Sequence, residues 1–301
     1  MVVISHAVDI AIQKASTAGI SVVGVNEYAS ATGAIGHWSY IMARKGFISI
    51  VMSQCPEMVA PHGSHEPIYG TNPLAMGIPL QHVPKDYEKV NKVEVVSTGA
   101  TSTSPSTPST SNLPEAIVLD MATSAYAWYG LVAAKEAGEP IPNDIAYNSS
   151  GQPTTDPSAA MVGGALRSFD RSYKGSHLAL MVELLAGAFT GASMVEKSEA
   201  KNWGTLLICI DPNLLGDRVG FTERAQQMCL RVQNAKLLPV DGGIGGIDTN
   251  IDTNTNTSAP KTPKSLYLPG QRGDEMCRRN MECGTIPIKY TVHASLLNMC
   301  S

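Results

Sequence analysis

The 301-residue sequence lacks several features that mark common classes of protein. It has no excess of positive charge, because 22 lysines and arginines face 26 aspartates and glutamates and the net charge is −4, so nucleic acid is not an expected partner. No apolar stretch approaches the ~20 residues that a membrane-spanning helix needs, so no membrane is expected. The N-terminal stretch MVVISHAVDIAIQKAS has no basic start and polar residues interrupt it, which does not fit a secretory signal.

The common cofactor and catalytic motifs are also missing. There is no G-x-G-x-x-G between a predicted strand and a helix and no G-x-x-x-x-G-K-[ST]. H-E-x-x-H and G-x-S-x-G are absent, so a zinc peptidase or an α/β-hydrolase has no support. None of the six cysteines belongs to a C-x-x-C pair. They predict reduced thiols in an intracellular, cytoplasmic protein with no disulfide framework and no metal site.

Apolar segments of two lengths predict a mixture of strands and helices, and therefore an α/β or α+β fold. The predicted strands are residues 19–25, 47–53, 73–79, 116–124 and 203–211. The predicted helices are residues 1–16, with Val3, Ala7, Ile10, Ala11 and Lys14 on one side, and residues 31–46, 125–140, 176–192 and 218–235. The fourth helix is strongly apolar and is predicted to be buried.

Two segments of biased composition are expected to be unstructured surface loops. Residues 97–112 are rich in serine, threonine and proline, and residues 241–264 are rich in glycine, asparagine and threonine. Neither can bury enough apolar surface to offset its ordering entropy. The GGIGG stretch lies in the second of them with no strand before it, and it is not predicted to bind phosphate.

Three polar turns are the best candidates for a binding site: GTNP at residues 70–73, DMATS at 120–124 and RSYKGS at 171–176, each expected to follow a strand. Their glycines let the backbone approach a ligand closely. Lys174 adds a positive charge, and Ser124 with the amides after it could cap a helix and hold an anion. Spacing alone leaves open that each is an ordinary cap or turn.

Taken together, these motifs resemble one family, the type 2 malate/L-lactate dehydrogenases, which also includes ureidoglycolate, sulfolactate and diketogulonate dehydrogenases. The resemblance follows family order over almost the whole chain outside the two biased segments. The stretches that carry it are GAIGHW (33–38), VAPHGSHEPIYGTNPLAMGIP (59–79), IVLDMATSAYAWYGLV (117–132), GEPIPNDIAYNSSGQPTTDPSAAMVGGAL (138–166), YKGSHLALMVELLAGAFTGA (173–192) and LYLPGQRG (266–273).

The resemblance implies an enzyme that transfers a hydride between NAD or NADP and a small 2-hydroxy or 2-oxo acid. It implies an α/β (α+β) fold whose nucleotide domain is not a Rossmann fold but a mostly antiparallel mixed sheet flanked by helices. It also implies a homodimer with sites near the subunit interface. On this basis residues 1–240 form the nucleotide-binding domain, 241–264 a linker, and 265–301 a C-terminal segment packed near the cofactor site.

Carried over position by position, the resemblance implies a set of cofactor contacts from three parts of the chain. Two lie in the turns above, and the third lies in the C-terminal segment. No metal ligand is implied. The cofactor residues are Asp120, Met121, Ala122, Thr123, Ser124, Lys174, Gly175, Pro269 and Gly270.

The sequence departs from the family pattern where catalysis is expected. Ala31 stands at a histidine position, Gln54 and Cys55 at an Asn-Ser pair, and Arg171 and Ser172 at a Gly-Gly pair. The chain is expected to begin after the family's N-terminal Ser-His-Gly region. Three interpretations follow: a truncated gene model, a diverged enzyme, or a catalytically silent paralogue that binds nucleotide or pairs with an active subunit.

Hydride transfer from an alcohol needs a base for the hydroxyl proton. Two side chains are candidates: Asp156, whose alternative role is a cap for the helix that follows, and His62, whose alternative is an ordinary loop histidine. Glu183, within an apolar helix, is predicted to be a structural partner of a cation or a backbone group. The substrate and the choice between NAD and NADP are not specified by the sequence.

Overall fold

The computed structural model describes residues 2–81, 113–237 and 266–285, and the chain divides into two units between Gln227 and Met228. The predicted loops at 97–112 and 241–264, and with them GGIGG, lie outside the described residues. The first unit contains the sheet and the three polar turns. The second contains helix α8 (Gln271–Cys283).

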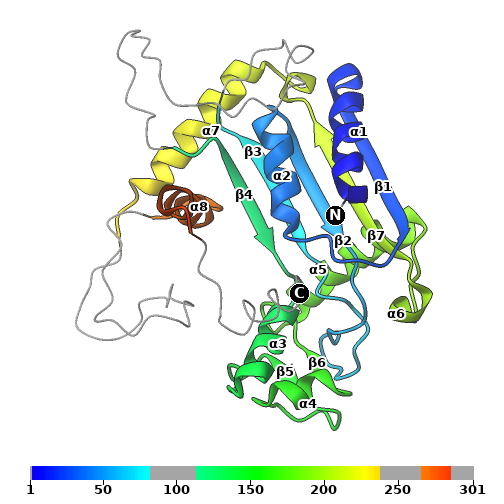
Figure 1. Cartoon of the computed structure of the whole chain (residues 1–301). Coiled ribbons are helices and arrows are strands. Elements are labelled where there is room, and N and C mark those ends of the chain that lie inside the picture. Colours follow the sequence, from blue (N-terminus) through cyan, green and yellow to red (C-terminus); the bar gives the residue numbers. More distant parts are fainter. Residues whose placement is uncertain (1, 82–112, 238–265, 286–301) are drawn as a thin grey trace. The chain divides into compact units, whose positions relative to one another are not determined.

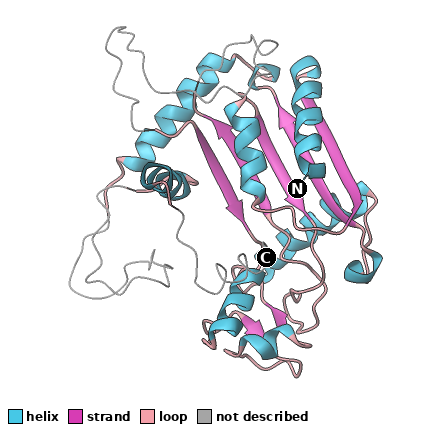
Figure 2. Ribbon diagram, in the orientation of Figure 1, coloured by secondary structure: helices cyan, strands magenta, loops and turns pink. Residues whose placement is uncertain are grey.

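A five-stranded antiparallel sheet organises the first unit (Figures 1 and 2). All four strand pairings in it are antiparallel. The predicted mixed fold with a mostly antiparallel sheet is therefore confirmed, and all five strands lie within or overlap their predicted segments. In sheet order they are β1 (Ile20–Tyr28), β7 (Trp203–Ile210), β2 (Ile48–Ser53), β3 (Leu74–Pro79) and β4 (Ala116–Met121).

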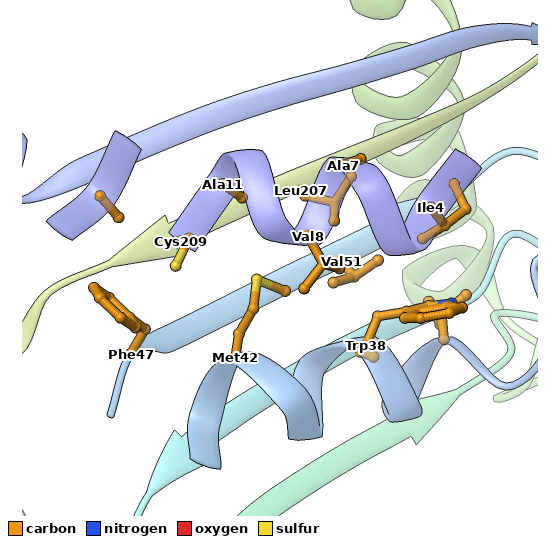
Figure 3. Close-up of a cluster of buried hydrophobic side chains, with 13 residues drawn as sticks. Ile4, Ala7, Val8, Ala11, Trp38, Met42, Phe47, Val51, Leu207 and Cys209 are labelled. Atoms are coloured by element: carbon orange, nitrogen blue, oxygen red, sulfur yellow. The ribbon is translucent and has the colours of Figure 1, made fainter. Parts of the chain in front are cut away.

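Helices α1 (Val2–Ala18) and α2 (Ile35–Arg44) cover one face of the sheet. Figure 3 shows their inward side chains meeting those of the strands, with Trp38 and Met42 of α2 facing α1 across Val51. Alternation along the strands supplies the partners, because Leu207 and Cys209 point to this face. These contacts make the largest buried apolar cluster in the described part of the chain.

The predicted face of α1 was partly wrong. Val3 and Ile10 are 49% and 37% exposed, and the buried stripe is rotated by about one residue toward Ile4 and Val8. Ala7 and Ala11 belong to both stripes, so the sequence pattern is compatible with either. In the structure, α2 and the sheet contact the stripe that contains Ile4 and Val8.

The opposite face of the sheet carries α5 (Tyr173–Val182), which continues as a π-helical turn at Glu183–Gly187 and a 3-10 turn at Ala188–Thr190. Val182 and Ala186 pack on Met52, Leu74 and Leu206. The approach is close: a Cβ on Gly204 of β7 would lie 1.7 Å from the Ala186 carbonyl oxygen. Only glycine therefore allows this strand to meet the helix.

The predicted burial of this apolar helix holds for one side only. Its outward side chains are 40–68% exposed, because the sheet covers a single face of the helix. We call these residues the outward stripe. They are Met181, Leu184, Leu185 and Phe189.

A second apolar cluster lies beyond the sheet and joins short elements (Figure 1). Gly138, with φ +66°, ends its longest helix in the left-handed conformation that favours glycine. Leu131, Ile145 and Leu166 are fully buried there. The elements are α3 (Trp128–Ala137), β5 (Ala146–Tyr147), α4 (Pro157–Met161) and β6 (Ala165–Leu166).

Two further helices of the described chain are α6 (Lys197–Ala200) and α7 (Arg218–Gln233). The helices found in the described ranges are too short or too polar to cross a bilayer. The five cysteines of those ranges are free thiols.

Candidate functional site

Two of the three polar turns, GTNP and DMATS, meet at the buried side chain of Thr123, and the segment just before the third turn bonds to the same residue. Its amide and its hydroxyl both donate to the carbonyl of Thr71, at 2.9 and 3.1 Å. Its own carbonyl accepts the amide of Phe169 at 2.9 Å. The DMATS turn is therefore held between the GTNP turn and the segment that leads into α5. The prediction that each turn follows a strand was wrong for GTNP, which precedes β3.

Asp120 connects the end of β4 to the start of α2. Its Oδ2 accepts the amide of Gly36 at 2.8 Å, which places a negative charge at the helix N-terminus, where it is stabilising. A Cβ on Gly36 would lie 2.7 Å from the Cβ of Asp120, so glycine is required for this approach. The rest of the Asp120 side chain is exposed.

The predicted cofactor residues differ in how exposed they are and in whether their hydrogen-bonding groups are already used within the protein. Thr123 and Ser124 are buried, and their hydroxyls donate to the carbonyls of Thr71 and Tyr126. Met121 and Ala122 are half-buried beside them. These four residues form a packed wall. Lys174 is exposed in the first turn of α5 and makes no ion pair with any residue that the structure describes.

Gly175 is buried, and its amide donates to Oδ1 of Asp170 at 3.0 Å. A Cβ at this position would lie 2.4 Å from the same oxygen. The backbone donor of Gly175 is thus occupied within the protein. Pro269 and Gly270 lie in the second unit, just before α8, and their role at the cofactor stays a prediction.

Asp170 is a site residue that the sequence analysis missed. Its carboxylate accepts the amide of Ser172 at 3.0 Å and the Ser172 hydroxyl at 2.7 Å, in addition to the amide of Gly175. Burial raises the pKa of Asp170, but these hydrogen bonds outweigh it and lower the pKa to about 2. The available signal was an aspartate two residues before the serine that precedes α5, a typical Asx-turn spacing.

Glu183 lies directly behind the GTNP turn, in a buried polar cluster. Its Oε1 is 2.6 Å from Nζ of Lys197 and accepts the amide of Gly70 at 3.1 Å, while Oε2 accepts from Nε2 of Gln54 at 2.9 Å. The two charged side chains are 3% and 1% exposed. The prediction that Glu183 is a structural partner of a cation and a backbone group is confirmed. Lys197 itself was missed.

The two candidate proton-transfer residues occupy different settings. Asp156 caps α4, because its Oδ1 accepts the amide of Ser158 at 2.8 Å, and the alternative cap role is therefore observed. His62 is exposed, and its amide donates to the hydroxyl of Ser176 at 3.0 Å. The loop that carries His62 thus rests on the first turn of α5, close in sequence to Lys174.

Two other kinds of site find no support in the part of the chain that the structure describes. Burial raises the pKa of the Cys55 thiol, so this cysteine is not an activated thiolate. Residues 2–81, 113–237 and 266–285 contain no group of three or more histidine, cysteine, aspartate or glutamate side chains placed to hold a metal ion.

Comparison with known proteins gives a family match over most of the chain. A family model described as malate/L-lactate dehydrogenase matches residues 1–87 and 96–244. L-sulfolactate dehydrogenase of Methanothermobacter thermautotrophicus is 30% identical over 250 residues, covering 81% of this chain and 63% of that protein. Ureidoglycolate dehydrogenase (NAD(+)) of Escherichia coli is 31% identical over 242 residues, covering 77% and 58%. The chain thus spans less than two thirds of these relatives.

Solved structures show the same fold. Malate dehydrogenase from Pyrococcus horikoshii superimposes with a TM-score of 0.69 at 22% identity, covering 99% of this chain and 69% of that one. The delta1-piperideine-2-carboxylate reductase from Pseudomonas syringae gives a TM-score of 0.66 at 26% identity, covering 97% and 72%.

We expect removal of one partner of the Glu183–Lys197 pair to be strongly destabilising. Lys197→Met leaves a buried carboxylate without its cation and should lower the free energy of unfolding by about 3–5 kcal/mol. The double variant with Glu183→Gln should recover much of that loss, because neither charge remains. Chemical denaturation of the three proteins measures both effects. If the free energy of unfolding of Lys197→Met is within about 1 kcal/mol of the wild-type value, the buried ion pair is contradicted.

The pKa of Asp170 predicts a pH dependence of stability. Because the folded-state pKa is about 2, below the ordinary value of 3.8, the ionised carboxylate stabilises the native state above pH 4. This contribution is lost as the pH falls through 2. Denaturation midpoints of the wild type and Asp170→Asn should therefore converge between pH 4 and pH 2. A difference that stays constant over this range would contradict the prediction.

Proposed function

Because the chain belongs to the malate/L-lactate dehydrogenase family, we propose that it binds a nicotinamide cofactor and serves hydride transfer to or from a small 2-hydroxy or 2-oxo acid. The observation that carries the proposal is the meeting at Thr123 of the GTNP turn, the DMATS turn and the segment that leads into the RSYKGS turn. Relatives named for NAD(+) and for NADP(+) both occur, and their named substrates are small carboxylic acids. The first unit would be a nucleotide-binding domain without the Rossmann arrangement.

The donors present fit the chemistry of a dinucleotide. Lys174 offers an ammonium with no ion pair among the described residues, a point charge suited to a phosphate, at the start of α5. The amide of Gly175 is occupied by Asp170, so we assign phosphate binding here to the Lys174 side chain. The packed wall of the DMATS turn would lie against the cofactor through its backbone and half-buried side chains. Pro269 and Gly270 are proposed to complete the site.

The bound cofactor would accept or donate the hydride, and the protein must move one proton. Oxidation of a 2-hydroxy acid breaks the C–H bond at the carbinol carbon, and the hydroxyl proton passes to a base. We propose His62 as that base, because its loop rests on α5 next to Lys174 and its side chain is exposed. Asp156 is the second candidate, since its cap uses one carboxylate oxygen.

A catalytically silent protein that binds nucleotide, or pairs with an active subunit, is the second candidate function. The observation that favours it is the state of the two bases: Asp156 serves as a helix cap, and no hydrogen bond within the described residues orients the His62 ring. Turnover separates the two functions. The silent protein would bind NADH without oxidising it when a 2-oxo acid is supplied.

We expect Lys174→Ala to weaken nucleotide binding at least tenfold, because a charge-assisted hydrogen bond contributes about 1.5–3 kcal/mol. Titration of the full chain with NADH and NADPH, followed by quenching of the tryptophans Trp38, Trp128 and Trp203, measures it. Lys135→Ala, which removes an exposed lysine from α3, is the control. The proposed function fails if the folded protein binds neither nucleotide.

A homodimer is the remaining part of the proposal. The outward stripe of α5 and its continuation exposes four large apolar side chains in a row, an arrangement that a partner surface would cover. Phe189→Asp should shift the protein to the monomer in sedimentation equilibrium. Val162→Asp, at an equally exposed valine after α4, should leave the association state unchanged. A monomeric wild type would reject the dimer.

A further inference from the structure

We propose that a hollow between residues 60–64 and 167–171 binds an oxyanion, the carboxylate or phosphate group of a ligand, and that Arg171 determines its affinity. The hollow lies in the first unit. It is next to the DMATS turn, because Ser168, which lines it, forms a β-bridge with Ser124. Only the source of the anion rests on the proposed function. The residues that argue for the site are His62, Ser64, Tyr147, Arg167 and Arg171.

Arg167 forms the fixed part of the hollow. Its Nη1 contacts the Asp144 carboxylate, its Nη2 donates to the Arg171 carbonyl at 3.1 Å, and its guanidinium lies 5.3 Å from the centre of the Tyr147 ring. Burial and the charge of Arg171 both lower the pKa of Arg167. The two guanidinium groups therefore repel each other, and an anion bound at Arg171 would reduce that repulsion.

Arg171 is the available cation. Its side chain is exposed, and its Nη1 donates to the carbonyl of Phe169 at 3.0 Å. It makes no ion pair with the residues that the structure places, so most of its five donors are free. A guanidinium matches the two oxygens of a carboxylate or phosphate better than an ammonium does.

No carboxylate of the described residues forms an ion pair with Arg171. Asp144 pairs with Arg167, and Asp170 is engaged by the amides of Ser172 and Gly175. Ser64 adds a donor on the opposite wall, because its hydroxyl oxygen accepts the amide of Glu66 and its hydrogen remains free. The hollow therefore presents several donors, and its lining residues include two arginines and no carboxylate.

Arg171 also has an unusual backbone, with φ +56°. This left-handed conformation is disfavoured for a long side chain and comfortable for glycine. Arg171→Gly therefore removes the charge without straining the fold. Lys201 provides a matched control, because it is an exposed cation with φ +50° outside the hollow.

The test is calorimetric titration of the full chain with inorganic phosphate at low ionic strength. We expect Arg171→Gly to weaken phosphate binding at least tenfold and Lys201→Gly to change it less than twofold, with thermal unfolding confirming that both variants fold. Phosphate binding that is equal in the two variants, or no binding by the wild type at tens of millimolar, would overturn the proposal.

Two further arms identify the source of the anion. If Arg171→Gly weakens NADPH but not NADH, the hollow takes the 2′-phosphate of the cofactor. If both nucleotides bind as in the wild type and a 2-oxo acid such as pyruvate binds more weakly, it takes the substrate carboxylate. A wild type that binds phosphate but neither nucleotide would support the anion site while rejecting the proposed function.

Discussion

The buried pair of Glu183 and Lys197 is the interaction on which the candidate site depends. Removing two charges from water costs several kcal/mol for each ion, and here the cost is offset because the carboxylate accepts from an ammonium, the amide of Gly70 and the side chain of Gln54. Four segments of the chain are joined in this way. The GTNP turn is thereby fixed from behind, and through Thr71 it positions Thr123. The pair therefore has a structural role: it holds the turns of the candidate site in place.

Much of the fold could be predicted because strands that are buried on both faces form short apolar runs, as in β2 and β7. The buried face of each helix was harder to predict. The spacing in α1 fits two stripes one residue apart, and only its neighbours decide between Ile4 and Ile10. The apolar helix at 176–192 was predicted to be buried, yet a local pattern cannot show that the sheet covers one side alone.

The candidate site, too, could be predicted from the sequence only in part. Composition located the three turns, but the meeting of GTNP and DMATS at Thr123 depends on the pairing of β3 with β4, which is a property of the whole sheet. Lys197 could not be found, because its surroundings, EKSEAK, have the composition of a solvated surface. Asp170 was overlooked among ordinary turn residues. In both cases the function of a side chain follows from contacts with residues distant in the fold or from a cap geometry that the composition does not show.

The π-helical turn at Glu183–Gly187 has a consequence for how this chain can vary in length. A π turn holds about one residue more than an α turn, and each residue of an α-helix advances the direction of its side chain by about 100°. Deleting one residue here would remove the extra residue of the π turn and restore regular helix, so the direction of Phe189 relative to Glu183 would change little. A residue deleted from the regular helix of α5 would instead turn Phe189 by about 100° relative to the residues before the deletion. The π turn is therefore the place where this segment can lose one residue while its inward and outward faces stay in register.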